Sequence, residues 1–155
     1  GRPLSYEGRV YVTSAPNPRN GNFGLRALDA ATGAPVWSAE ASAAYSEPFT
    51  RSGLVAVTTS AGQVLMVDPA TGELMEKVGI GGSCLDSSAV VGPEGTLIIG
   101  TTDGQIRLAG GRVSDREPLA VQVGDGFIFS KVAVSGDRAF IGTMDGKVYA
   151  ISLAP

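Results

Sequence analysis

Few residues of this chain carry the chemistry that enzymes use. The sequence has no histidine and a single cysteine, Cys84, so it lacks the side chain that most often acts as a general base and as a metal ligand. Ser88 and Ser130 are hydroxyls with a charged residue nearby in sequence, Asp86 and Lys131 respectively. A serine nucleophile here would need lysine or a carboxylate as its base. The sequence therefore predicts no catalytic residue.

Cys84 and the glycine-rich segment before it favour a structural role. Cys84 has no cation or helix start close in sequence that would lower the pKa of its thiol, which predicts a small core residue rather than a reactive one. Val78–Ser83 has the glycines of a phosphate-binding loop but lacks the lysine and the following helix that such a site requires. We interpret it as a loop between repeats, and we predict neither a bound cofactor nor a bound metal.

Composition and charge exclude several classes of protein. The chain has 12 basic and 15 acidic residues, a net charge of −3 and no basic run, so nucleic acid is not an expected partner. One cysteine excludes a disulfide within the chain. The apolar stretches are far shorter than a membrane span, and the sequence starts at Gly1 without a charged and then apolar leader. We expect a soluble chain, processed or excised from a longer one.

The elements that hold these residues recur with a period of about 40 residues. Each copy contains an apolar alternating run, a tight turn and a second alternating run, which is the pattern of an antiparallel meander. The Asp-Gly pairs at 103–104 and 145–146 are 42 residues apart, and Asp29 and Asp68 are 39 apart. With 43% hydrophobic and only 17% charged residues, and with 22 glycines, the composition suits a packed all-β chain with many turns.

Two kinds of turn are expected between the strands. At Asp103-Gly104 and Asp145-Gly146 we predict two-residue primed hairpin turns, in which both central residues have positive φ. At Asp29–Gly33 and Asp68–Gly72 the aspartate is expected to accept backbone N–H bonds and the glycine to take the left-handed conformation. Because these aspartates recur at the repeat spacing, each lies on a different repeat. They are therefore predicted to form turns rather than a metal cluster.

The predicted fold is all-β, a β-propeller of four-stranded antiparallel blades with about four repeats, which makes a partial or half propeller. Residues 1–155 are expected to form a single propeller segment. Its approximate repeats are 1–40, 41–82, 83–125 and 126–155. The strand that precedes the two alternating runs in the later repeats is expected at Pro48–Thr50, Ser88–Val91 and Lys131–Val134.

The segment Ala27–Trp37, Ala-Leu-Asp-Ala-Ala-Thr-Gly-Ala-Pro-Val-Trp, closely resembles the motif of the pyrroloquinoline-quinone-type propeller repeat. In that family Ala-x-Asp-x-x-Thr-Gly is followed by a tryptophan at this spacing, and the tryptophan packs between adjacent blades. The resemblance covers the first repeat and the turn of the second, where Glu76 occupies the tryptophan position. The third repeat, at Leu108–Glu117, has lost the aspartate turn, and the fourth ends at Pro155 before its turn.

The resemblance implies a ring of about seven or eight blades, which about four repeats cannot close. Three alternatives remain open: part of a longer polypeptide, two copies associated head to tail, and an unusually small closed propeller. We favour the fragment because the last repeat ends abruptly. The chain could also be one subunit of a larger assembly, in which neighbouring chains cover its open edges.

The function that the resemblance implies is a non-enzymatic propeller module of a periplasmic, secreted or cell-surface bacterial protein, acting as a protein- or ligand-binding or assembly scaffold. Related repeats occur in outer-membrane assembly lipoproteins and in sensor domains of bacterial kinases. The alternative is a fragment of a quinoprotein dehydrogenase whose active site is completed by residues outside this chain. Such enzymes use a cysteine pair, a tryptophan floor and calcium-binding carboxylates, a set that this sequence does not offer. Added quinone with calcium would give a bound chromophore only in this second case.

Propellers bind partners at loops that rigid strands hold in place. The largest insertion in the array is Ala15–Gly24, which replaces the turn of the first repeat. The expected partner is another protein, or additional copies or blades that complete the propeller, and the alternative for this loop is an insertion without a role. The predicted partner contacts in it are Asn17, Arg19, Asn20, Asn22 and Phe23.

Overall fold

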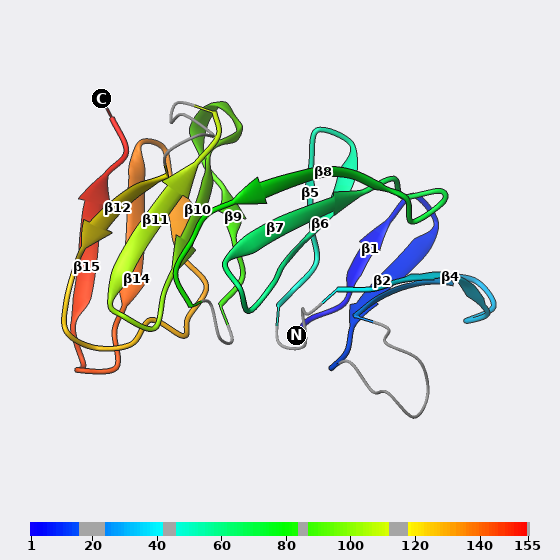
Figure 1. The fold of residues 1–155 in the computed structure, drawn as a ribbon, viewed down its shortest axis with the longest axis horizontal. Helices are drawn as coiled ribbons and strands as arrows, with labels where there is room; N and C mark the ends of the chain where they lie inside the picture. The colour runs from blue at the N-terminus through cyan, green and yellow to red at the C-terminus, as the bar shows by residue number, and fades with distance from the viewer. Residues whose placement is uncertain (16–23, 42–45, 84–86, 112–117, 155) are drawn as a thin grey trace.

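The computed structural model is an all-β chain of four antiparallel sheets, which we call blades 1 to 4 (Figure 1). It describes residues 1–15, 24–41, 46–83, 87–111 and 118–154. Blade 1 contains β1 (Leu4–Tyr6), β2 (Arg9–Thr13), β3 (Leu25–Asp29) and β4 (Pro35–Ala39), and blade 2 contains β5 (Phe49–Arg51), β6 (Leu54–Thr58), β7 (Gln63–Val67) and β8 (Leu74–Gly79). Blade 3 contains β9 (Val90–Val91), the 3-10 turn η1 (Pro93–Gly95), β10 (Leu97–Gly100), β11 (Gln105–Ala109) and β12 (Leu119–Gln122). Blade 4 contains β13 (Ala133–Ser135), β14 (Arg138–Gly142) and β15 (Val148–Ser152).

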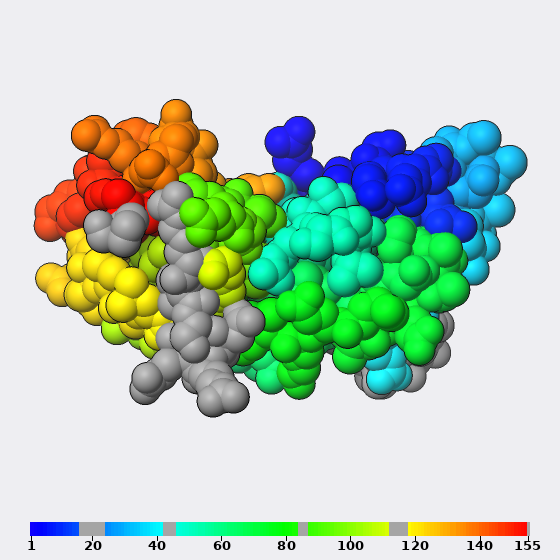
Figure 2. Space-filling model, turned by 90° about the horizontal axis from the view of Figure 1, so that it is seen from above, coloured from blue at the N-terminus to red at the C-terminus, as the bar shows by residue number. Residues whose placement is uncertain are grey.

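Each blade is a meander in which every strand pairs with the next one along the chain. The blades follow one another in chain order, with blade 1 on the right of Figure 1 and blade 4 on the left, and Figure 2 again places them at opposite ends. Glu47, just before β5, forms an ion pair of 3.2 Å with Lys131, just before β13. The inner strands therefore converge toward one axis, and the predicted β-propeller class is confirmed.

The strand registers define equivalent positions in the four blades. Successive side chains of a strand point to opposite faces of its sheet, so each blade directs one set of residues toward the following blade and another toward the preceding one. On the second strand of each blade, the central residues that face the following blade are Tyr11, Ala56, Ile98 and Phe140. Their partners on the third strand are Ala27, Met66, Leu108 and Ala150.

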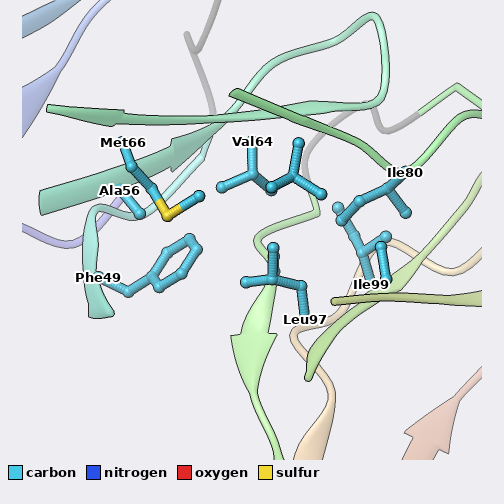
Figure 3. Close-up of a cluster of buried hydrophobic side chains, with 10 residues drawn as sticks. Phe49, Ala56, Val64, Met66, Ile80, Leu97 and Ile99 are labelled. Atoms are coloured by element: carbon cyan, nitrogen blue, oxygen red, sulfur yellow. The ribbon is translucent and has the colours of Figure 1, made fainter. Parts of the chain in front are cut away.

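Three apolar clusters fill the joints between consecutive blades. Each cluster draws buried side chains from both blades, and Figure 3 shows the one between blades 2 and 3. Burial of such surfaces is the main favourable term in folding, so the joints hold the blades together. The first joint contains Tyr11, Leu25 and Ala27 against Val55, Val57 and Val67. The second contains Phe49, Ala56 and Met66 with Leu97 and Ile99, and the third contains Ile98 and Ile106 with Ala139 and Ile141.

The hairpins between second and third strands differ from the prediction. Gly104 has a φ of 75°, but Asp103 does not have a positive φ, so a primed turn at this pair was wrong. The N–H of Gly104 donates to the Thr101 carbonyl at 3.2 Å, and the N–H of Thr101 donates to the Gln105 carbonyl at 3.0 Å. These bonds define a hairpin loop longer than two residues that ends in a left-handed glycine. The hairpin at Asp145-Gly146 has the same hydrogen bonds and the same glycine conformation. The Thr101 hydroxyl, which contacts the Asp103 carboxylate, fixes the wider turn.

The aspartate turns follow the prediction. The carboxylate of Asp68 accepts the N–H of Thr71 at 2.8 Å, and Gly72 takes a φ of 77°. The hydrogen bond from the Thr71 N–H is the main cause that holds the pKa of Asp68 below its ordinary value. At Asp29 the hydroxyl of Thr32 is the main cause of the same lowering of the pKa. These carboxylates are turn formers, as expected.

The joint between blades 1 and 2 centres on one backbone carbonyl. The oxygen of Pro69 accepts hydrogen bonds from Arg9 Nη1 at 2.8 Å, from the Tyr11 hydroxyl at 3.1 Å and from Trp37 Nε1 at 3.1 Å. The Trp37 ring also lies on Gly72, where an added Cβ would stand 2.7 Å from ring carbons. Trp37 therefore packs between adjacent blades, as the resemblance implied.

At the next joint an ion pair takes the place of the tryptophan. Glu76 holds the register position of Trp37, as the sequence predicted. Its carboxylate lies 3.2 Å from Arg51 Nη1, and Arg51 Nε donates to the Gly95 carbonyl of blade 3 at 3.0 Å. Arg51 thus connects blade 2 to blade 3 through a backbone carbonyl, as Trp37 connects blade 1 to blade 2.

We expect Gly72→Ala to destabilise the chain more than Gly33→Ala. Both glycines have φ near +75°, so each alanine bears the same left-handed cost of about 1 to 2 kcal/mol. Only at Gly72 does the new Cβ meet the Trp37 ring, whereas nothing lies within 4 Å at Gly33. The extra cost at Gly72 should be about 1 to 3 kcal/mol, measured by urea unfolding of dilute protein. In a Trp37→Ala background the two substitutions should cost the same; an undiminished difference would contradict the Trp37 contact.

Candidate binding face

The hairpins between second and third strands and the links between blades lie at the same end of the strands, because each blade is a four-strand or three-strand meander. We call this end the turn face. In blades 2 to 4 its hairpins share the pattern Thr-x-x-Gly, at 59–62, 101–104 and 143–146. The predicted partner contacts fall in the sequence between β2 and β3 and lie outside the described residues: Asn17, Arg19, Asn20, Asn22 and Phe23.

The serines considered above as nucleophiles, and the lysine considered as a base, make structural contacts on this face. The buried Ser88 hydroxyl accepts the N–H of Glu47 at 2.6 Å. The Ser130 hydroxyl donates to a backbone carbonyl of blade 4 at 3.2 Å, and Lys131 is paired with Glu47. Asp86 lies outside the described residues. These groups connect the links of blades 2, 3 and 4 around the propeller axis.

In the glycine-rich segment Val78–Ser83, residues 80–83 lie in the link from blade 2 to blade 3, as predicted, whereas Val78 and Gly79 are the last residues of β8. N–H groups in it donate to the Gly62 carbonyl at 2.8 and 2.9 Å. An added Cβ at Gly82 would stand 2.8 Å from Arg107 Nε, so the arginine of blade 3 lies directly against this segment. The glycines therefore serve close packing between blades. Cys84 lies outside the described residues, and its assignment to the core stays a prediction.

A charged pair lies in the hairpin of blade 4. Lys147 Nζ is 3.0 Å from Asp145 Oδ2. The Thr143 hydroxyl, followed by Lys147, lowers the pKa of Asp145, and the Asp145 carboxylate raises the pKa of Lys147. Both groups are charged at neutral pH and act as an exposed ion pair. Among the described residues, no three His, Cys, Asp or Glu side chains gather in a way that could hold a metal ion.

An apolar patch stands on the turn face beside the third joint. Phe127, in the link to blade 4, is 51% exposed, and Met144, in the hairpin of blade 4, is 67% exposed. The N–H of Met144 donates to the Phe127 carbonyl at 3.0 Å, which holds the two residues together. The ring of Phe127 meets that of Phe129 edge-on, with centroids 5.6 Å apart. We call Phe127, Phe129 and Met144 the aromatic patch. Sequence reasoning missed it, although two phenylalanines flanking a buried isoleucine were a possible signal.

The joint between blades 3 and 4 contains an apolar cleft where the first joint has a tryptophan. Leu119 holds the register position of Trp37. A leucine reaches less far than an indole, and a cleft of about 250 Å³ remains beside it. The cleft is lined mainly by Ile98, Leu108, Leu119, Val121, Ile151 and Leu153.

Solved structures share the fold of this chain at low sequence identity. The computationally designed Ika4 protein superposes with a TM-score of 0.75 at 13% identity, over 98% of this chain and 89% of Ika4. BamB from Moraxella catarrhalis superposes with a TM-score of 0.69 at 17% identity, over 98% of this chain and 42% of BamB. The computationally designed Ika8 protein superposes with a TM-score of 0.73 at 13% identity, over 97% of this chain and 44% of Ika8.

These comparisons support the propeller fold and do not assign a family. No protein-family description matches the sequence, and no curated protein matches it either. The chain spans most of Ika4 but less than half of BamB and of Ika8. Within the described residues, no helix is long and apolar enough to span a membrane.

Leu119→Trp should stabilise the third joint. The indole fills the cleft of about 250 Å³ and reaches the turn after β15, as Trp37 reaches Pro69. Filling a cavity typically gains about 0.5 to 2 kcal/mol, to be measured by urea unfolding. Met75→Trp is the matched control, because Met75 is 58% exposed and does not line the cleft. Equal effects of the two substitutions would show that the cleft is not the cause.

Proposed function

We propose that this chain is a non-enzymatic β-propeller module that acts as a protein- or ligand-binding or assembly scaffold. The observation that carries the proposal is that the polar side chains singled out in the sequence make structural contacts, whereas apolar side chains are exposed on the turn face. Ser88, Ser130 and Lys131 hold links and strands together, and Asp29 and Asp68 close turns. The groups that could do chemistry are thus engaged in the framework, while exposed apolar side chains stand at the turn face.

We also propose that the repeats belong to the pyrroloquinoline-quinone-type family. Supporting this, Trp37 ends the motif that begins at Ala27, and its ring and N–H contact the aspartate turn of blade 2. This is the contact between blades that the resemblance implied for a tryptophan at this spacing. From the same resemblance we propose a periplasmic, secreted or cell-surface location in a bacterium.

The aromatic patch is the contact surface that we propose for a protein partner. Isolated exposed apolar residues are common, but Phe127 and Met144 are adjacent through a backbone hydrogen bond. The ion pair of Glu47 and Lys131 also lies on the turn face. Aromatic and methionine side chains are enriched at the centre of protein interfaces.

Artificial binders provide a test that does not require the natural partner. Peptides selected from a random display library against the whole chain should bind preferentially at the aromatic patch. Their affinity for the Phe127→Ser, Met144→Ser double variant should fall at least tenfold, because central apolar contacts carry most binding energy. Both residues are more than half exposed, so the variant should keep its melting temperature within a few degrees.

The matched control is Met75→Ser, which removes an exposed side chain from the outer strand of blade 2. Binding of the selected peptides to this variant should be unchanged. If most peptides bind the double variant as tightly as the original chain, the aromatic patch is not a preferred contact surface and this proposal fails.

A further inference from the structure

Blade 4 exposes a face that is buried in the two central blades. Phe140 is 38% exposed and Val148 is 79% exposed, on the side of the sheet away from blade 3. The strand registers give these two residues equivalents in blades 2 and 3. Those equivalents are fully buried against the following blade: Ala56 and Val64 in blade 2, Ile98 and Ile106 in blade 3.

Blade 1 has the complementary face. Val10 and Val12 point away from blade 2 and are half-buried. Their equivalents in the later blades face the preceding blade and are buried almost completely: Val55 and Val57, Leu97 and Ile99, Ala139 and Ile141. Figures 1 and 2 place blades 1 and 4 at opposite ends of the molecule, so the two open faces do not cover each other within one chain.

Two residues on the open face of blade 4 occupy the same positions as residues that bind across the first joint. Arg138 and Phe140 of blade 4 hold the register positions of Arg9 and Tyr11 in blade 1. Both Arg9 and Tyr11 donate to the Pro69 carbonyl across the first joint. Arg138 is exposed on the open side of blade 4. Blade 4 therefore presents an arginine donor at the position of Arg9 and, at the position of Tyr11, an aromatic ring without the hydroxyl.

Blade 1 carries the turn that such a pair binds. Asp29–Gly33 has the same hydrogen bonds and the same left-handed glycine as Asp68–Gly72. Ala30 occupies the place of Pro69, but Ala30 is exposed whereas Pro69 is buried. Of the three donors to Pro69 at the first joint, the arginine thus recurs on blade 4 as Arg138, and the acceptor turn recurs on blade 1.

For the segment 1–155 by itself, we infer that a second copy covers both faces, with blade 4 of each copy packed on blade 1 of the other, so that two copies close one propeller. In this arrangement Arg138 donates to the Ala30 carbonyl of the second copy, and Val148 and Phe140 are buried against its Val10 and Val12. The inference deepens the proposed assembly role by naming the partner.

The length of the chain agrees with this arrangement. The chain superposes on 42% of BamB and 44% of Ika8, so two copies come to slightly less than one such chain. It also superposes on 89% of Ika4, which is therefore a solved chain of comparable length. Head-to-tail contacts of this kind form a closed ring when the rotation between copies closes.

The test is the mass of the chain in solution, measured by light scattering over a range of concentrations. The chain should have twice the mass of one copy. Val148→Glu and Val10→Glu should each reduce it to one copy, because a charge buried without a partner is costly. Met75→Glu is the control and should leave the double mass unchanged, since Met75 stays 58% exposed in a blade with neighbours on both faces.

Mixing the two variants tests which faces meet. Val148→Glu keeps an intact blade 1 face, and Val10→Glu keeps an intact blade 4 face. An equimolar mixture should therefore regain the mass of two copies through one intact joint, at higher concentration than the original chain. Circular dichroism establishes that each variant is folded. If either variant fails to fold, Arg138→Ala replaces it as an exposed substitution, and it should raise the concentration needed for association at least tenfold.

Three results would overturn the inference. A single-copy mass at every concentration shows that the open faces do not bind a second copy. A double mass that survives both glutamate variants, or is not regained on mixing, places the contact elsewhere or pairs like faces. A mass that keeps growing with concentration shows open polymers instead of a closed pair. None of these results changes the peptide-binding test of the aromatic patch, so the two proposals fail separately.

Discussion

The structure depends on one constraint: each blade has two apolar faces, and each face needs a neighbour. Val55 and Val57 of β6 face blade 1 while Ala56 faces blade 3, and all three are fully buried. A single sheet cannot bury both faces by itself. Stability therefore comes from the joints between blades, and each central blade contributes to two of them. The exposed face of blade 4 lacks the neighbour that the central blades have within residues 1–155.

One position on the fourth strand is used differently at each joint. At the first joint Trp37 reaches the turn of the next blade and shares the Pro69 carbonyl with two other donors. At the second, Glu76 pairs with Arg51, which binds a carbonyl of blade 3. At the third, Leu119 leaves a cleft. The apolar clusters are common to all three joints, so the fold tolerates this variation.

The aspartate turns and the tryptophan contact between blades were predictable from the sequence, whereas one class of hairpin and most other contacts between blades were not. The turn at Asp68 follows from a short carboxylate and a glycine four residues later, and the structure agrees. The primed turn at Asp103-Gly104 was wrong because the Thr101 hydroxyl adds contacts that a dipeptide rule omits. The aromatic patch escaped notice because Phe127 lies in a link without repeat periodicity. The equivalence of Arg138 and Arg9 could be recognised only once the strand registers were known.

Hydrogen exchange followed along the chain tests most directly whether covered faces are the source of stability. In dilute protein the amides of β6, β7, β10 and β11, whose sheets have neighbours on both faces, should exchange more slowly than those of β14, which is also paired on both sides within its sheet. At concentrations where two copies associate, β14 should become as slow as the central strands. If β14 is already as protected as β10 and β11 in dilute, single-copy protein, coverage by a neighbouring blade does not determine stability and the account is wrong.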